Sequence, residues 1–136
     1  MYKKICIALD NSPTDTAILE HIRGLAKLTN AQLILVHVAD GFGARLQNEL
    51  NLEDSEEIKK DQSYLDRLEQ QLSTEGFNVK AVLVQGKEPV DGILSVVESE
   101  RCDLIAMATH GHGFIKDVIL GSVGRIYATA RTSRSL

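Results

Sequence analysis

The chain has 136 residues, 43% of them apolar and 25% charged, and this composition excludes a disordered or fibrous protein. Its net charge of -4 argues against a general nucleic-acid binder, and no apolar segment approaches the roughly 20 residues needed to span a bilayer. We therefore expect a single cytoplasmic domain over residues 1–136, with no nucleic-acid partner and no membrane insertion. The apolar run Ile5–Leu9 is too short for a secretory signal, and Cys6 and Cys102 are expected to be buried free thiols.

Apolar runs and helix-start signals alternate along the chain. Short runs rich in Val, Ile and Leu predict strands that are buried on both faces of a sheet. A small polar residue before proline predicts a helix start, as at Ser12-Pro13, and Gly76 fits the left-handed residue that ends a helix. In chain order we expect a strand at 4–9, a helix at 13–28, a strand at 32–38, a loop at 39–53, a helix at 54–75, a strand at 79–84, a helix at 89–100, a strand at 104–108 and a helix at 121–130.

Strands separated by helices form βαβ units. The predicted fold is therefore α/β, with a Rossmann-like open parallel sheet and helices on both of its faces. The acidic residues 53–57 fit the first turn of the second helix, where carboxylates interact favourably with the helix dipole. Residues 101–136 carry a surplus of positive charge, which either favours an anion site in this part of the chain or is a chance distribution of surface charge.

Candidate ligand-binding residues follow three of the predicted strands, because ligands of open parallel sheets bind at the carboxyl ends of the strands. Asp10 follows the first strand, and Val38 ends the second. Gly111 and Gly113 follow the fourth strand, where glycines allow backbone N–H groups to approach a phosphate, and Ser122 can cap the last helix. Taken alone, the two glycines fit a simple loop equally well. The sequence has neither a GxxxxGK[ST] segment nor a GxGxxG after the first strand, which excludes a P-loop nucleotidase and disfavours a dinucleotide-binding fold.

The chain resembles the universal stress protein family over nearly its whole length. The resemblance is carried by ICIALDNSPTDTA, LILVHVAD and MATHGHGFIKDVILGSV. Nucleotide-binding members have a Gly, two residues, a Gly, nine residues, a Gly and then Ser or Thr. Gly111, Gly121 and Ser122 match this pattern, whereas Ala108 stands in place of its first glycine.

The resemblance implies a function and a site. It implies binding of ATP, with Mg²⁺ or Mn²⁺ on the phosphates, by a regulatory or interaction module that hydrolyses ATP slowly at most and has no catalytic residue. Asp10 would lie beside the ribose, the backbone of Val38 would bind adenine, and the glycine-containing segments would enclose the phosphates. The implied binding residues are Ala8, Asp10, Val38, Ala108, Gly111, His112, Gly113, Gly121, Ser122 and Val123.

Other interpretations of the same residues stay open. Asp10 could simply cap the first helix, and His110 and His112 could be solvated loop residues rather than phosphate ligands. His37, inside an apolar strand, is expected to be a hydrogen-bonded structural residue. Ala108 also fits the family members that bind no nucleotide and act as dimeric interaction proteins with an unidentified protein partner. A third class, an ATP-cleaving enzyme of a related fold, would need a catalytic base that the sequence does not indicate.

The family resemblance also implies the order of the strands. It implies the spatial order 3-2-1-4, followed by a fifth strand that often pairs across a homodimer interface. The chain ends where that strand would begin, so we expect the fifth strand to be missing. The edge of the fourth strand would then be exposed unless another segment or chain covers it.

Overall fold

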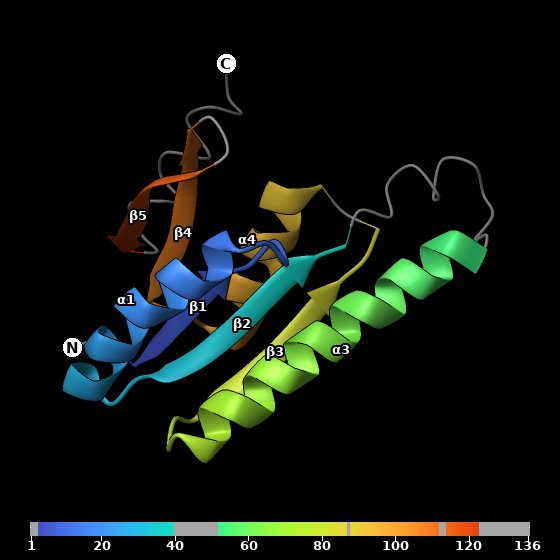
Figure 1. The fold of residues 1–136 in the computed structure, drawn as a ribbon. Helices are drawn as coiled ribbons and strands as arrows, with labels where there is room; N and C mark the ends of the chain where they lie inside the picture. Colours follow the sequence, from blue (N-terminus) through green and yellow to red (C-terminus); the bar gives the residue numbers. More distant parts are fainter. Residues whose placement is uncertain (1–2, 40–51, 87, 112–113, 123–136) are drawn as a thin grey trace.

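A five-stranded sheet in the order β3-β2-β1-β4-β5 forms the centre of the computed structural model (Figure 1). The structure describes residues 3–39, 52–86, 88–111 and 114–122, and at 52–55, 108–111 and 114–120 it describes the backbone alone. The elements are β1 (Lys4–Ala8), α1 (Thr14–Thr29), β2 (Gln32–Val38), α3 (Leu52–Thr74), β3 (Val79–Val84), α4 (Pro89–Glu100), β4 (Leu104–Gly111) and β5 (Phe114–Ser122).

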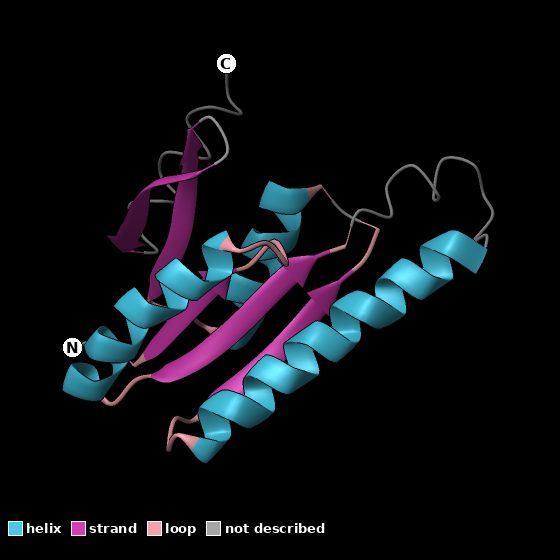
Figure 2. Cartoon of the chain, in the orientation of Figure 1, coloured by secondary structure: helices cyan, strands magenta, loops and turns pink. Residues whose placement is uncertain are grey.

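Helices cover both faces of the sheet, as predicted (Figure 2). Successive strand residues point to opposite faces, so Ile5 and Ile7 of β1 pack on one side of the sheet and Cys6 packs on the other. The first face is covered by α1 and α3, which bury Ile18, Ile22, Leu65 and Leu72 against it. The second face is covered by α4 through Val96 and Val97. The central strands β1 and β2 are therefore buried on both sides, which explains their largely apolar sequences.

Two left-handed residues end the helices of the first face. Gly76 has a φ of 99° and follows α3, as expected from the sequence. The amide of Phe77 donates to the carbonyl of Leu72 at 3.0 Å, and that of Gly76 donates to Ser73 at 3.0 Å, a pattern that satisfies the last carbonyls of the helix. Asn30, with a φ of 57°, ends α1 in the same backbone region, which asparagine tolerates better than most residues. Cys6 and Cys102 are both buried and free, as predicted.

The carboxyl-terminal part of the sheet differs from the prediction. The expectation that the fifth strand is missing is wrong: β5 pairs antiparallel with β4, so the sheet is mixed rather than wholly parallel. The strand that was expected to end at Ala108 continues to Gly111. A helix was expected to begin at Gly121, but Gly121 and Ser122 are the last two residues of β5. The rest of that expected helix lies outside the described residues. The sequence FIKDVILGS is rich in β-branched and apolar residues that suit a strand, and its pairing covers the edge of β4.

Within the described ranges, no helix combines the length and the apolar character needed to cross a membrane.

Candidate functional site

The loop between β1 and α1 is held in place by a buried carboxylate. Asp15, in the first turn of α1 and 4% exposed, accepts hydrogen bonds from the backbone amides of Asp10 at 3.2 Å and Asn11 at 2.9 Å. Tyr64 of α3 donates its hydroxyl to the same carboxylate at 2.5 Å. Asn11 adopts a left-handed φ of 59°, which turns the chain from the strand toward the helix. One side chain thus sets the conformation of the loop at the carboxyl end of β1.

Burial governs the electrostatics of this carboxylate. Burial raises the pKa of Asp15 above its ordinary value, and the hydrogen bonds from Tyr64 and from the Asp10 amide offset only part of this effect. Burial and the bond to the Asp15 carboxylate also raise the pKa of Tyr64. Tyr64 therefore stays protonated near neutral pH and remains the donor in the pair.

A second set of polar contacts joins β2 to α3 and the same loop. His37, at the end of β2, is buried; its Nδ1 lies 2.9 Å from the carbonyl oxygen of Leu9, and its Nε2 lies 3.1 Å from a carboxylate oxygen of Asp61 in α3. Asn11 donates from Nδ2 to the other oxygen of Asp61 at 3.0 Å. The ring of His37 therefore links the end of β1 to α3. The expectation that His37 is a hydrogen-bonded structural residue is confirmed.

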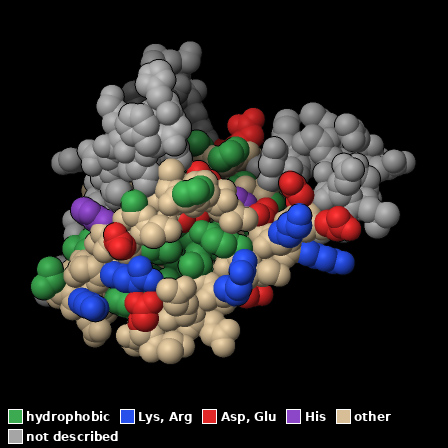
Figure 3. Space-filling model, in the orientation of Figure 1, with side chains coloured by type: hydrophobic (Ala, Val, Ile, Leu, Met, Phe, Trp, Pro, Cys, Tyr) green, Lys and Arg blue, Asp and Glu red, His purple; other side chains and the backbone are tan. Residues whose placement is uncertain are grey.

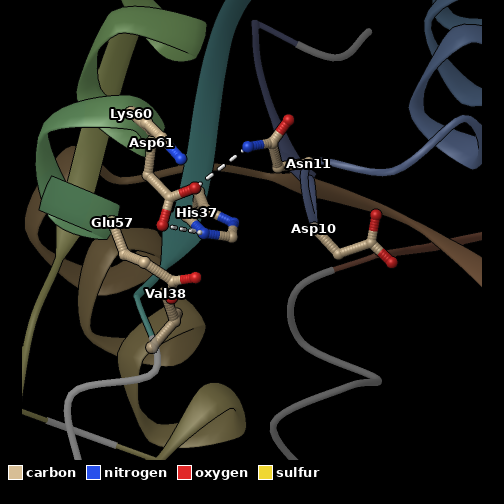
Figure 4. Close-up of a pocket in the computed structure, with 7 residues that line it drawn as sticks. All are labelled: Asp10, Asn11, His37, Val38, Glu57, Lys60 and Asp61. Atoms are coloured by element: carbon tan, nitrogen blue, oxygen red, sulfur yellow. Dashed lines mark hydrogen bonds and ion pairs between the residues drawn. The ribbon is translucent and has the colours of Figure 1, made fainter. Parts of the chain in front are cut away.

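These contacts border an open pocket at the carboxyl ends of β1 and β2 (Figure 4). Its volume is about 320 Å³. We call it the acidic pocket, because three of its residues are carboxylates; it is lined by Asp10, Asn11, His37, Val38, Glu57, Lys60 and Asp61. Such a surface offers many hydrogen-bond acceptors and suits a ligand that carries hydroxyl or amino donors.

The carboxylate of Asp10 has partners of its own at the edge of this pocket. One oxygen accepts from the hydroxyls of Ser12 at 2.5 Å and Thr14 at 3.4 Å. Figure 4 shows this carboxylate turned away from His37. Asp10 therefore takes part in the local turn before α1. A capping role was the alternative interpretation of Asp10, but Pro13 occupies the N-cap position, and no side-chain hydrogen bond caps the helix there.

The structure brings together only some of the residues implied by the sequence. Ala8, Asp10 and Val38 lie at the carboxyl ends of β1 and β2, and the backbones of Ala108 and Gly111 lie at the carboxyl end of β4, on the same edge of the sheet. By contrast, the pairing of β4 with β5 places Gly121 beside Ile105 and Ser122 beside Leu104, at the amino end of β4. In this structure these two residues thus lie at the opposite edge from the acidic pocket. His112, Gly113 and Val123 lie outside the described residues.

Several residues at the site were not indicated by sequence reasoning. Asp15 and Tyr64 define the loop, while Asp61 and Glu57 contribute α3 carboxylates to the pocket. Glu57 was expected only as part of an acidic helix start. The available signal was helical spacing, since Glu57, Asp61 and Tyr64 recur at intervals of three or four residues along one side of α3. Among the described residues, no group of three or more His, Cys, Asp or Glu side chains is arranged to hold a metal ion.

Comparison with known proteins agrees with this architecture. The model of the universal stress protein family matches residues 1–127. The chain is 31% identical over 143 aligned positions to Universal stress protein MJ0577 of Methanocaldococcus jannaschii, an alignment that covers 90% of this chain and 86% of that protein. The solved structure of MJ0577 has a TM-score of 0.71 at 30% identity and is matched over 82% of this chain and 77% of that one.

A second solved structure is described with a bound nucleotide. It is a universal stress protein from Archaeoglobus fulgidus in complex with dAMP, with a TM-score of 0.58 at 25% identity, and the match covers 78% of this chain and 80% of that one. The fold, the family model and the sequence identity to MJ0577 lead to the same conclusion. This chain belongs to the universal stress protein family.

Proposed function

We propose that this protein binds an adenine nucleotide, ATP in particular, at the carboxyl ends of β1 and β2, and that it acts as a nucleotide-responsive regulatory or interaction module. The observation that carries the proposal is the acidic pocket, which lies where Asp10 and Val38 meet at one edge of the sheet. Ligands of open α/β sheets bind at this edge. The dAMP complex of the Archaeoglobus fulgidus relative supports an adenine nucleotide as the ligand class.

The chemistry of the pocket suits the nucleoside part of such a ligand. Carboxylates such as Glu57 accept hydrogen bonds from ribose hydroxyls or from the amino group of adenine. Val38 provides backbone groups and a half-buried apolar side chain at the end of β2. We expect Mg²⁺ or Mn²⁺ to enter with the phosphates of ATP, and hydrolysis to be slow at most. A homodimer and a cytoplasmic location stay predictions from the sequence.

A second candidate function is a dimeric interaction protein that binds no nucleotide. The observation that favours it is the position of Gly121 and Ser122 beside the amino end of β4, away from the acidic pocket. Ala108, in place of a glycine, points in the same direction.

Thermal unfolding with and without ATP and Mg²⁺ separates the two candidates. A ligand that binds only the folded chain at one hundred times its Kd stabilises it by about 2.7 kcal/mol, which raises the Tm by on the order of 10 °C for a domain of this size. The variant Asp10→Ala removes a hydrogen-bond acceptor that the proposal places beside the ribose hydroxyls, and it should reduce this rise. Glu20→Gln, an exposed change on α1, serves as the matched control and should keep it. An unchanged Tm at millimolar ATP would contradict nucleotide binding and favour the second candidate.

A further inference from the structure

Asp61 is a half-buried carboxylate on a helix that is otherwise rich in exposed charge. The space-filling view shows acidic and basic groups mixed along the exposed side of α3 (Figure 3). The side chain of Asp61 is only 18% exposed, and each of its carboxylate oxygens has a partner of its own. One oxygen accepts from Nδ2 of Asn11 at 3.0 Å, and the other lies 3.1 Å from Nε2 of His37 (Figure 4). A single carboxylate thus bridges the loop after β1 and the end of β2.

Both partners of Asp61 are chain neighbours of the residues that the proposed function assigns to the nucleotide. Asn11 follows Asp10, and His37 precedes Val38. All of these residues line the acidic pocket. Because the peptide bond is stiff, a displacement of Asn11 or His37 carries the neighbouring residue with it. The carboxylate of Asp61 is therefore placed to set the distance between the two sides of the pocket.

Further bonds restrict the position of each partner. The backbone amide of Asn11 donates to the buried carboxylate of Asp15 at 2.9 Å, and Nδ1 of the buried His37 ring lies 2.9 Å from the carbonyl oxygen of Leu9. A bond between groups that are already restricted loses little conformational entropy when it forms. The bridge made by Asp61 therefore keeps this side of the pocket in one arrangement before a ligand arrives, which lowers the cost of binding.

The engagement of both oxygens distinguishes Asp61 from its neighbour Glu57. Glu57, one helical turn earlier on α3, lines the same pocket with an exposed side chain. An exposed carboxylate can turn toward a ligand, whereas a carboxylate with two partners is held in one orientation. Glu57 thus suits contact with a ligand, and Asp61 suits support of the residues around it.

We propose that Asp61 is a positioning residue of the nucleotide site, which holds Asp10 and Val38 at the spacing that the sugar and the base require. It acts through Asn11 and His37, and this role rests on the proposed function. Asp61 affects the nucleoside part of the ligand and not its phosphates. Adenosine and ATP should therefore lose affinity by the same factor when Asp61 is replaced.

Calorimetric titration of the full chain with ATP and Mg²⁺, and separately with adenosine, tests this role. We expect Asp61→Ala to weaken the binding of both ligands by on the order of tenfold, a loss comparable to that of one hydrogen bond. Asp61→Asn keeps an oxygen acceptor and adds an amide donor at the same place, so it should recover most of the affinity. Asp66→Ala is the matched control, because Asp66 is an exposed carboxylate of α3 that accepts a hydrogen bond from Gln62 and does not line the pocket.

A double-mutant cycle with Asn11 tests the route by which Asp61 acts. Asn11→Gly removes the side-chain donor, and glycine readily adopts the left-handed φ of 59° at this position. In Asn11→Gly/Asp61→Ala the second change removes a bond that is already broken. The losses of affinity in the two single variants should therefore not multiply in the double variant.

The outcomes separate positioning from a purely structural contact. If Asp61→Ala unfolds more easily yet binds both ligands as the wild type does, the positioning role is overturned. A loss of affinity confined to ATP, an equal loss in Asp61→Asn, or losses that multiply in the double variant would overturn it as well.

Unfolding curves without ligand show whether each variant folds. Should Asp61→Ala not fold, Asn11→Gly decides alone: weaker binding of both ligands supports the role of the bridge, and full affinity overturns it. Absence of binding of either ligand by the wild type would instead refute the proposed function, and the role of Asp61 would fall with it.

Discussion

Replacement of Asp15 by alanine tests whether one buried carboxylate holds the loop at the carboxyl end of β1. The change removes three hydrogen bonds, from the amides of Asp10 and Asn11 and from the hydroxyl of Tyr64. A hydrogen bond to a charged group contributes about 1.5–3 kcal/mol, and the lower value applies here because burial of the carboxylate opposes the gain and the two amides can regain water. We therefore expect Asp15→Ala to lower the free energy of unfolding by about 4 kcal/mol.

Urea unfolding at neutral pH measures this loss. With a denaturant slope of about 1.5 kcal/mol/M, the midpoint should fall by about 2.5 M. Tyr64→Phe is the matched control, because it removes one of the three bonds and keeps both bonds to the loop, at an expected cost of about 1.5 kcal/mol. A loss below about 1 kcal/mol in Asp15→Ala, or equal losses in the two variants, would refute the idea that Asp15 organises the loop.

The pH dependence provides a second check on the same group. Burial raises the pKa of Asp15 from its ordinary 3.8, so the folded chain holds this proton more tightly than the unfolded chain does. The resulting stabilisation is complete below 3.8 and is lost as the pH rises through the pKa of the folded state. Asp15→Asn cannot ionise, so its unfolding free energy should lack this decline. An identical pH profile in wild type and Asp15→Asn would show that the carboxyl has no raised pKa.

Three other changes have distinct expected outcomes. Gly92→Ala places a Cβ 2.7 Å from a methyl carbon of Val38 and should destabilise the fold by about 1–3 kcal/mol in urea unfolding. In Gly24→Ala the new Cβ lies in the middle of α1 and meets no atom within 4 Å, so this change should instead stabilise the fold by about 0.5–1 kcal/mol. A stability change of the same sign in both variants would contradict the packing around α4. Glu75→Gln breaks the 2.9 Å ion pair with Arg23, whose guanidinium lowers the pKa of Glu75. The ion pair stabilises the fold above the ordinary Glu75 pKa of 4.5, and this stabilisation is lost as the pH falls through the lowered pKa. The unfolding free energies of wild type and Glu75→Gln should therefore differ at pH 7 and converge in acid.

Local signals predicted most of the sheet and its helices. The limits of β2 at Gln32–Val38, β3 at Val79–Val84 and α4 at Pro89–Glu100 agree with the sequence prediction. An apolar run bounded by polar residues, or a proline in the first helical turn, acts on its own neighbourhood and needs no distant partner. The strand order 3-2-1-4, implied by the family resemblance, is likewise found in the structure.

The segment Phe114–Ser122 shows where local signals fail. Gly121 and Ser122 suggested a helix start, whereas the β-branched residues of the segment suit a strand. The choice depends on pairing with β4, which leaves the edge of that strand covered. Strand pairing is a contact between segments, so the propensity of one segment cannot decide it.

The sequence by itself determined that Asp10 and Val38 stand at the carboxyl ends of neighbouring strands in an α/β fold. Only the tertiary structure decided that Asp61 of α3 meets His37 of β2 there. The physical reason is that the burial of Leu65 and Leu72 against the sheet sets the rotation of α3 about its axis. That rotation determines which polar side chains face the loop, and it depends on packing between elements far apart in the chain.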